Sequence, residues 1–219
     1  SDICNIYFDT PDYRLIRRSL EKPVYKEKLR LRSYGTPDAD SRVFLELKKK
    51  YESVVYKRRE AMSYREALGF IETPTPHSQI TKEIAYFMSF YHGLAPAVFL
   101  SYKREAYYGI SDPEFRVTFD SDILWRDTDT ELSAGIYGTP ILPDGMRLME
   151  IKTPGAIPLW LAATLSEEGI RQTSFSKYGR AYEAIAGAPS PCKRLYNIPA
   201  TITQTNQEKT APKGDKLYA

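Results

Sequence analysis

Histidine and cysteine are scarce in this 219-residue sequence, which holds two of each. Cys4 and Cys192 lie near opposite ends without CxxC spacing, which argues against a zinc ribbon and against a disulfide scaffold. With only His77 and His92, a multi-histidine zinc site is excluded. No apolar run approaches the roughly 20 residues that a membrane-spanning helix needs. The first ten residues also lack the basic and apolar regions of a secretory signal.

The rest of the composition is that of a globular protein. Charged residues make up 27% and hydrophobic residues 42%, enough for one sizeable domain with its own core. The net charge of +3 hides an asymmetry, because residues 1–60 hold 15 Lys+Arg against 10 Asp+Glu. A basic first quarter favours an anionic partner, although a solvated charged surface would look the same.

Strands with a few helices are expected along the chain. Alternating patterns predict strands, and apolar residues at helical spacing or helix start and stop signals predict helices. The expected strands are Ile3–Asp9, Tyr25–Tyr34, Val43–Tyr51, Ser53–Arg59, Val98–Tyr108, Phe115–Trp125 and Arg147–Lys152. The expected helices are Tyr13–Leu20, Ser78–Tyr91, Leu159–Leu165 and Ser174–Ala186, with residues 70–80 otherwise read as a loop. We expect one domain over 1–198 and a polar, disordered tail over 199–219.

The most informative strand runs through Lys26, Lys28, Arg30 and Arg32. Alternation places these four cations on one face and the intervening leucines on the other. Two other strands repeat the pattern. One face of the first carries Glu46, Lys48 and Lys50, one face of the second carries Arg116, Thr118 and Asp120, and the other face of each strand is apolar. Such a sheet either closes into a barrel with a charged lumen or stays open with its polar face in water, and alternation does not separate the two. The charged residues of this face are mainly Arg and Lys, with few Glu. This mixture suits a site in which the cations bind phosphates and the carboxylates hold a divalent metal that the phosphates also bind.

Six segments resemble the vacuolar transporter chaperone (VTC) domain, in family order over about residues 3 to 186. They are YFDTP from Tyr7, KLRLRSYG from Lys28, VFLELK from Val43, VVYKRR from Val54, LMEIK from Leu148 with Pro154-Gly155, and SFSKYG from Ser174. The resemblance implies an α+β fold in which an antiparallel β-barrel, the triphosphate tunnel, has helices packed on its outside. It also implies ATP-dependent synthesis of inorganic polyphosphate with Mn²⁺ or Mg²⁺.

Matching the family motifs position by position gives the expected site. The resemblance assigns phosphate or nucleotide contacts to Arg30, Arg32, Lys48, Lys57, Tyr102, Arg104, Arg116, Ser176 and Lys177, and metal binding to Glu150. Strand phase adds Lys28 and Lys152 as substrate contacts and Glu46 as a second metal-binding acid. ATP and polyphosphate are the expected partners, in the cytoplasm, with a membrane-bound partner left open.

One departure bears on activity. The family normally opens with a further strand, carrying a tunnel lysine, and a helix before the YFDTP segment, and this sequence begins after them. The short form resembles the stand-alone bacterial type. Two alternatives stay open beside the polymerase: a tunnel triphosphatase that releases phosphate, which needs the same cations and metal, and a non-catalytic polyphosphate-binding or assembly subunit, which the missing opening favours. Nucleic acid is not expected, because no run of stacking aromatics accompanies the basic face.

Overall fold

A computed structural model describes residues 1–52 and 54–187 and confirms the α+β class. The strands are β1 (Asp2–Asp9), β2 (Tyr25–Tyr34), β3 (Arg42–Tyr51), β4 (Val54–Ser63), β5 (Ala95–Tyr108), β6 (Arg116–Arg126), β7 (Thr139–Pro140) and β8 (Leu148–Lys152). The helices are α1 (Arg14–Leu20), α2 (Tyr64–Glu72), α3 (Gln79–Phe90), α4 (Leu159–Glu167) and α5 (Lys177–Ile185), with a short 3-10 turn η1 at Leu132–Ala134. The predicted tail lies outside the described residues.

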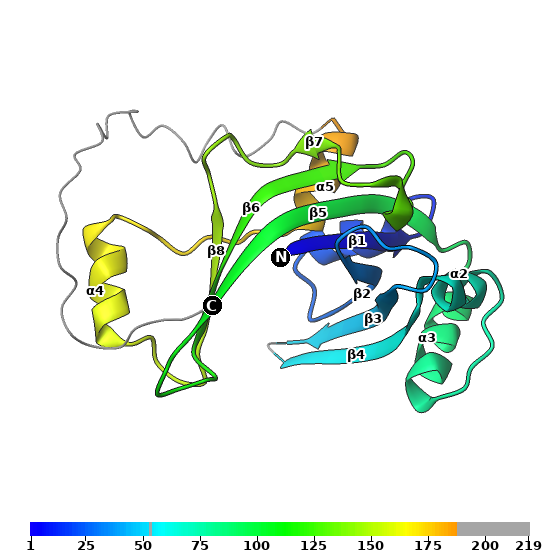
Figure 1. The fold of residues 1–219 in the computed structure, drawn as a ribbon, viewed down its shortest axis with the longest axis horizontal. Helices are drawn as coiled ribbons and strands as arrows, with labels where there is room; N and C mark the ends of the chain where they lie inside the picture. Colours follow the sequence, from blue (N-terminus) through cyan, green and yellow to red (C-terminus); the bar gives the residue numbers. More distant parts are fainter. Residues whose placement is uncertain (53, 188–219) are drawn as a thin grey trace.

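All the strands belong to one antiparallel sheet in the order β4-β3-β2-β1-β5-β6-β7, and β8 also pairs with β6. The sheet curves strongly, with β5 and β6 arching over β3 and β4 (Figure 1). Over the described residues β4 and β8 do not pair, so the sheet is open and the expected barrel is not confirmed. Alternation could not decide this, because a curved open sheet and a closed barrel share the same side-chain pattern.

The outer face of the sheet, defined by Leu29, Leu31, Leu45 and Leu47, carries the main core. These leucines are fully buried against apolar side chains of α2 and α3, and η1 adds Leu132. Farther along the same face, α4 covers β6 and β8 through Leu161. Burial of such side chains contributes about 1.5–3 kcal/mol each and fixes the strand register, since a slip by one residue would bury the cations instead.

The inner face is the opposite one and bears the cations. Here α5 and the buried Ile16 of α1 pack on Ile3, Val98 and Leu100. The prediction that the helices pack outside therefore holds for α2, α3 and α4 and is wrong for α5 and for Ile16 of α1. The YGRAYEAI stretch of α5 buries Tyr178 and Ala181 on the inner face, so the same helix brings its polar first turn to the cations.

Asp9 ties α1 and α5 together at one end of the inner face. Its buried carboxylate accepts hydrogen bonds from the amides of Leu15 and Ile16, which begin α1, and from the Tyr178 hydroxyl at 2.8 Å. Helix N-termini leave amide hydrogens unsatisfied, so a carboxylate stabilises the helix there. This explains the acid of the YFDTP segment as a structural residue.

Helix α2 is missing from the sequence prediction. Ser63 and Glu66 form a capping box, in which each side chain accepts from the other's backbone amide. The Ser-x-x-Glu spacing was the available signal. Within the described residues, none of the helices is long and apolar enough to cross a membrane.

Candidate functional site

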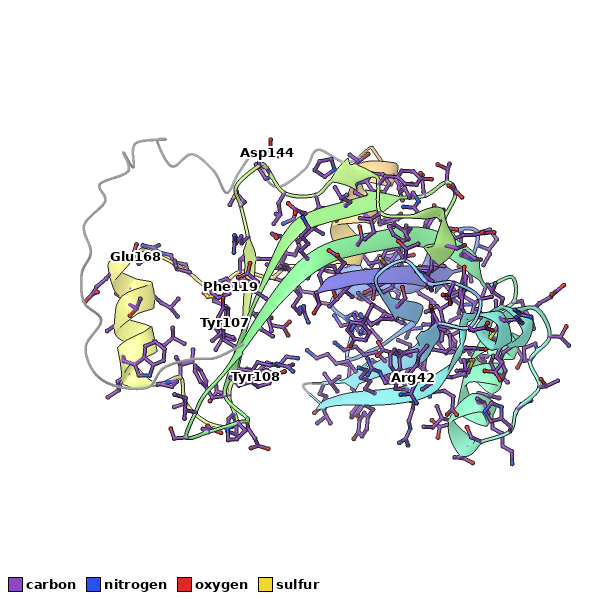
Figure 2. All side chains as sticks on the ribbon, in the orientation of Figure 1. Arg42, Tyr107, Tyr108, Phe119, Asp144 and Glu168 are labelled. Atoms are coloured by element: carbon purple, nitrogen blue, oxygen red, sulfur yellow. The ribbon has the colours of Figure 1, made fainter. Side chains whose placement is uncertain are left out.

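Cations dominate the inner face in successive cross-strand rows. Arg30, Glu46 and Arg59 form one row across β2, β3 and β4, and Lys28, Lys48 and Lys57 form the next. Across β5, β6 and β8 the rows begin with Arg104 opposite Asp120. Side chains from both halves of the curved sheet project into the space between them (Figure 2). The inner-face cations are Lys26, Lys28, Arg30, Arg32, Lys48, Lys50, Lys57, Arg59, Arg104, Arg116, Lys152 and Lys177.

Glu46 is the centre of the first cluster, which we call the Glu46 cluster and which consists of Glu46, Arg30, Lys57 and Arg59. The carboxylate is 1% exposed. Its Oε2 lies 2.6 Å from Nε of Arg30, and its Oε1 lies 2.8 Å from Nζ of Lys57 and 2.6 Å from Nε of Arg59. A buried charge has to be paired and hydrogen-bonded, and both oxygens meet that requirement here.

The surrounding charges keep Glu46 ionised. Burial alone would raise its pKa, but Arg30, Lys57 and Arg32 outweigh that effect and lower the pKa to about 2. One negative charge holds several positive ones, so the cluster keeps a net positive charge. Because both carboxylate oxygens already contact cations, which would repel a metal ion, the geometry disfavours the metal role expected for Glu46 and favours a positioning role.

Asp120 is the centre of the second cluster, the Asp120 cluster, formed with Arg104 and Lys177. Arg104 binds the carboxylate through two parallel hydrogen bonds, Nε to Oδ1 at 2.6 Å and Nη2 to Oδ2 at 2.7 Å. Lys177, the first residue of α5, donates to Oδ2 at 2.6 Å. Such two-pronged arginine pairs fix orientation as well as charge. The pKa of Asp120 is lowered, since these partners outweigh its burial.

Aromatic and helix-cap residues connect the two clusters. Arg32 donates to the Tyr102 hydroxyl at 3.1 Å and to the Asn5 amide oxygen at 2.8 Å. The Lys177 amine lies 4.5 Å from the centre of the Tyr102 ring. Ser176 caps α5 by accepting from the Gly179 amide, as expected for a helix start.

Lysines complete the link between the two halves of the sheet. Lys28 donates to the Ser176 hydroxyl at 3.3 Å. Among the described residues Lys48 has no ion-pair partner, and burial and the charge of Arg30 lower the pKa of its amine. The charge of Glu150 raises the pKa of the Lys48 amine and that of Lys152 lowers it. These two residues of β8 are therefore near Lys48 of β3 across the inner face.

Glu150 has a carboxylate that is more exposed and more loosely paired than those of Glu46 and Asp120. Its side chain is 47% exposed, 3.3 Å from the Lys152 amine and 3.9 Å from Arg104. Arg116 lies one row farther out, opposite Lys152 and Tyr108, and contacts neither cluster. Within residues 1–52 and 54–187, no group of three His, Cys, Asp or Glu side chains comes together as a metal site. A metal here would thus have one protein carboxylate, which suits Mg²⁺-type ions that share their ligands with substrate phosphates.

The structure adds residues that the sequence prediction assigned no role. Arg59 and Asp120 stand in direct contact with predicted site residues, and Asn5 orients Arg32. Strand phase carried the signal for Arg59, which is two residues from Lys57 and therefore on the same face. No local pattern pointed to Asn5, because its role depends on the pairing of β1 with β2.

A cavity of about 360 Å³ lies beside the site, between β5, β6 and the loop from Pro140 to Met146. Of the site residues it shares only Tyr102. The cationic rows therefore do not line this cavity.

Fold and site together define an α+β protein whose curved sheet presents an organised, cation-rich face. The family model described as the VTC domain matches residues 1–186. The chain belongs to the VTC-domain family. Among curated proteins, none matches the chain.

Proposed function

We propose that this protein is an ATP-dependent polyphosphate polymerase that transfers the terminal phosphate of ATP to a growing polyphosphate chain. The observation that carries the proposal is the charge of the inner face. Glu46 and Asp120 are each outnumbered by the cations that they hold, and Lys28, Lys48 and Lys50 have no carboxylate partner among the described residues. Such a face needs an anion with many charges, and membership of the VTC family supports polyphosphate.

The extent of the cationic face supports a polymer over a single triphosphate. Beyond the row of Lys28 and Lys48, Lys26 lies opposite Lys50 in a further row. Neighbouring rows are about 7 Å apart, since they are two residues apart along the strands. Burial, and after it the charges of Lys50, Lys48 and Lys22, lower the pKa of the Lys26 amine. A longer phosphate chain would relieve this repulsion.

The proposed chemistry asks the chain to hold and align phosphates. Arg30, Arg32, Lys48, Lys57, Arg104, Arg116 and Lys177 would clamp the phosphate oxygens, with Lys28, Tyr102, Lys152 and Ser176 as further contacts. Phosphoryl transfer depends mainly on positioning and charge neutralisation. The acceptor, a phosphate end, is already ionised at neutral pH, so no strong base is required. This fits an inner face on which the described strands carry no histidine.

Glu150 is the residue that would hold a divalent metal, Mn²⁺ or Mg²⁺. When bound, such an ion neutralises charge on the phosphates that it bridges. Lys152 and Arg104 lie close enough to Glu150 to orient its carboxylate. Because ATP is the donor in this proposal, we also place the protein in the cytoplasm.

Phosphorus NMR of the protein with ATP and Mn²⁺ tests the proposed reaction. Growth of internal-phosphate signal together with ADP is the expected result. Orthophosphate alone would replace the polymerase by a triphosphatase. Binding of polyphosphate without any turnover would leave a binding or assembly subunit.

The metal assignment has a matched pair of variants. Glu150→Gln removes the carboxylate assigned to the metal, whereas Glu105→Gln removes one of nearly equal exposure, 49% against 47%, on the outer face of β5. We expect Glu150→Gln to reduce metal-dependent turnover by at least about tenfold and Glu105→Gln to leave it unchanged. Full turnover by Glu150→Gln would reject the assignment.

A further inference from the structure

Tyr7 of β1 lies at the middle of the inner face, directly opposite Arg30 of β2. Its ring stacks on the ring of Tyr178 of α5, with centroids 4.7 Å apart and planes at 21°. Nη1 of Arg30 donates to the Tyr7 hydroxyl at 3.1 Å. Stacking and this hydrogen bond hold the phenol in one orientation, with its oxygen among the cations.

The hydrogen of that hydroxyl has no acceptor among the described residues. Arg30 is a donor, so it uses a lone pair of the Tyr7 oxygen and leaves the O–H unpaired. The charged groups that act most strongly on the phenol are also cations, Lys28 and Arg32 on β2 besides Arg30, and Lys48 on β3 acts on it too; the Glu46 carboxylate on β3 is held by Arg30. The remaining titratable neighbours are Tyr102 of β5 and Tyr178 of α5, and the Tyr178 hydroxyl already donates to Asp9.

The Tyr7 O–H lacks an acceptor and the groups around it are positively charged. A phosphate oxygen would supply both the acceptor and the negative charge. We propose that Tyr7 is a phosphate-binding residue, which donates its phenolic hydrogen to a phosphate oxygen that Arg30 and Lys28 also hold. The inference rests on the proposed function, because it takes the inner face as the phosphate site. It adds a neutral, directional contact to a site otherwise built from charges.

This role makes binding depend on the protonation of Tyr7. Burial alone would raise the pKa of the phenol, but Arg30, Lys28 and Arg32 outweigh it and lower the pKa to about 8. The ionised form has no hydrogen to donate and repels phosphate. Above the pKa, binding of a phosphate chain therefore requires the Tyr7 phenolate to take up a proton from solvent.

Tripolyphosphate binding without metal, measured by calorimetry, tests the proposal with two variants. Tyr7→Phe removes only the hydroxyl and keeps the ring that stacks on Tyr178. Tyr86→Phe removes an exposed hydroxyl on α3, far from the inner face. At about pH 7 we expect Tyr7→Phe to bind about tenfold more weakly or worse, and Tyr86→Phe to bind like the unmodified protein.

Two further readouts would not respond to a merely structural role. The affinity ratio between the unmodified protein and Tyr7→Phe, in which ionisation of the ligand cancels, should shrink as the pH rises through about 8. At about pH 9, tripolyphosphate should reduce the near-ultraviolet tyrosinate absorption of the unmodified protein by up to the contribution of one tyrosine, and should produce no such decrease in Tyr7→Phe.

The outcomes separate this inference from the proposed function. If the unmodified protein binds tripolyphosphate and Tyr7→Phe binds it equally well, Tyr7 is not a ligand and the proposed function stands. If the tyrosinate absorption of the unmodified protein does not decrease when the site is saturated, the proton-linked contact is likewise rejected. If the unmodified protein does not bind tripolyphosphate, the proposed function fails and the inference fails with it.

Discussion

The Glu46 cluster and the Asp120 cluster each hold several cations close together, but they are built from different parts of the chain. In each, a carboxylate that is 1% exposed or less holds cations that would otherwise repel one another. Glu46 takes its partners from β2 and β4, the two strands paired with its own. Asp120 pairs with Arg104 on the neighbouring strand but also with Lys177, which is 57 residues away in sequence. The first cluster forms with the sheet, and the second is complete only when α5 docks.

This difference shows that α5 has a structural role at the site. Lys177, Ser176 and Tyr178 are consecutive residues, and they contact Asp120, Lys28 and Asp9 respectively. Docking of α5 therefore completes the cationic face and anchors the start of α1 in one event. The comparison predicts that damage to Glu46 weakens the whole sheet, whereas damage to Asp120 is felt first at α5.

The largest expected effect is that of Glu46→Gln. The substitution keeps the size of the side chain but leaves Arg30, Lys57 and Arg59 without their counter-charge at a buried position. We expect the free energy of unfolding to fall by about 3–5 kcal/mol in urea titrations. A loss smaller than that caused by Asp120→Asn would contradict the ranking of the two clusters.

Low pH should reduce the contribution of Glu46 to the free energy of unfolding. The pKa of Glu46 is about 2 in the folded protein against an ordinary value of 4.5. A lowered pKa means that its stabilisation is fully present above the ordinary value and is lost as the pH falls toward about 2. The difference in unfolding free energy between the unmodified protein and Glu46→Gln should therefore narrow between about pH 4.5 and pH 2. A difference that stays constant over this range would exclude the charge as its source.

Asp120→Asn should have a smaller and more local effect. Fewer cations lose their partner, so we expect a loss of about 2–3 kcal/mol. Amide hydrogen exchange should increase over α5 before it increases over β2, β3 and β4. Equal increases in both regions would mean that α5 docks independently of the Asp120 cluster.

Arg58→Ala has the smallest expected effect on stability and serves as the reference for a surface ion pair. Arg58 lies on the outer face of β4, and its ion pair with Glu83 has side chains 52% and 25% exposed. Surface pairs of this kind contribute about 0.2–1 kcal/mol, so the loss in urea titrations should stay below about 1 kcal/mol. A loss comparable to that of Glu46→Gln would show that burial is not what distinguishes the clusters.

The same contrast explains what the sequence could predict. Strand alternation placed Lys28, Arg30 and Lys48 on one face, because that periodicity is local and the leucines between them fix the register. The partnership of Lys177 with Asp120 has no such signature, since it depends on where a helix near the end of the described region docks. The VTC resemblance assigned Lys177 to the expected site but gave no reason for its position.

Two other predictions depended on contacts between distant strands: the barrel is not confirmed, and the metal role of Glu46 stays a prediction that its contacts disfavour. Closure of the sheet depends on how β4 and β8 meet, and side-chain alternation contains no information about pairing between distant edges. The metal role expected for Glu46 followed from its strand phase alone. Phase placed its carboxylate on the correct face, but the cations that occupy both oxygens come from two other strands.

Tripolyphosphate affinity of two adjacent lysine variants tests the central claim, that the inner face binds phosphate chains, most directly. Lys48 points to the inner face without an ion-pair partner among the described residues, whereas Lys49 points to the outer face beside Glu27. We predict that Lys48→Ala weakens binding about tenfold and that Lys49→Ala leaves it unchanged, with both proteins fully folded. Equal affinities for the two variants would contradict the account.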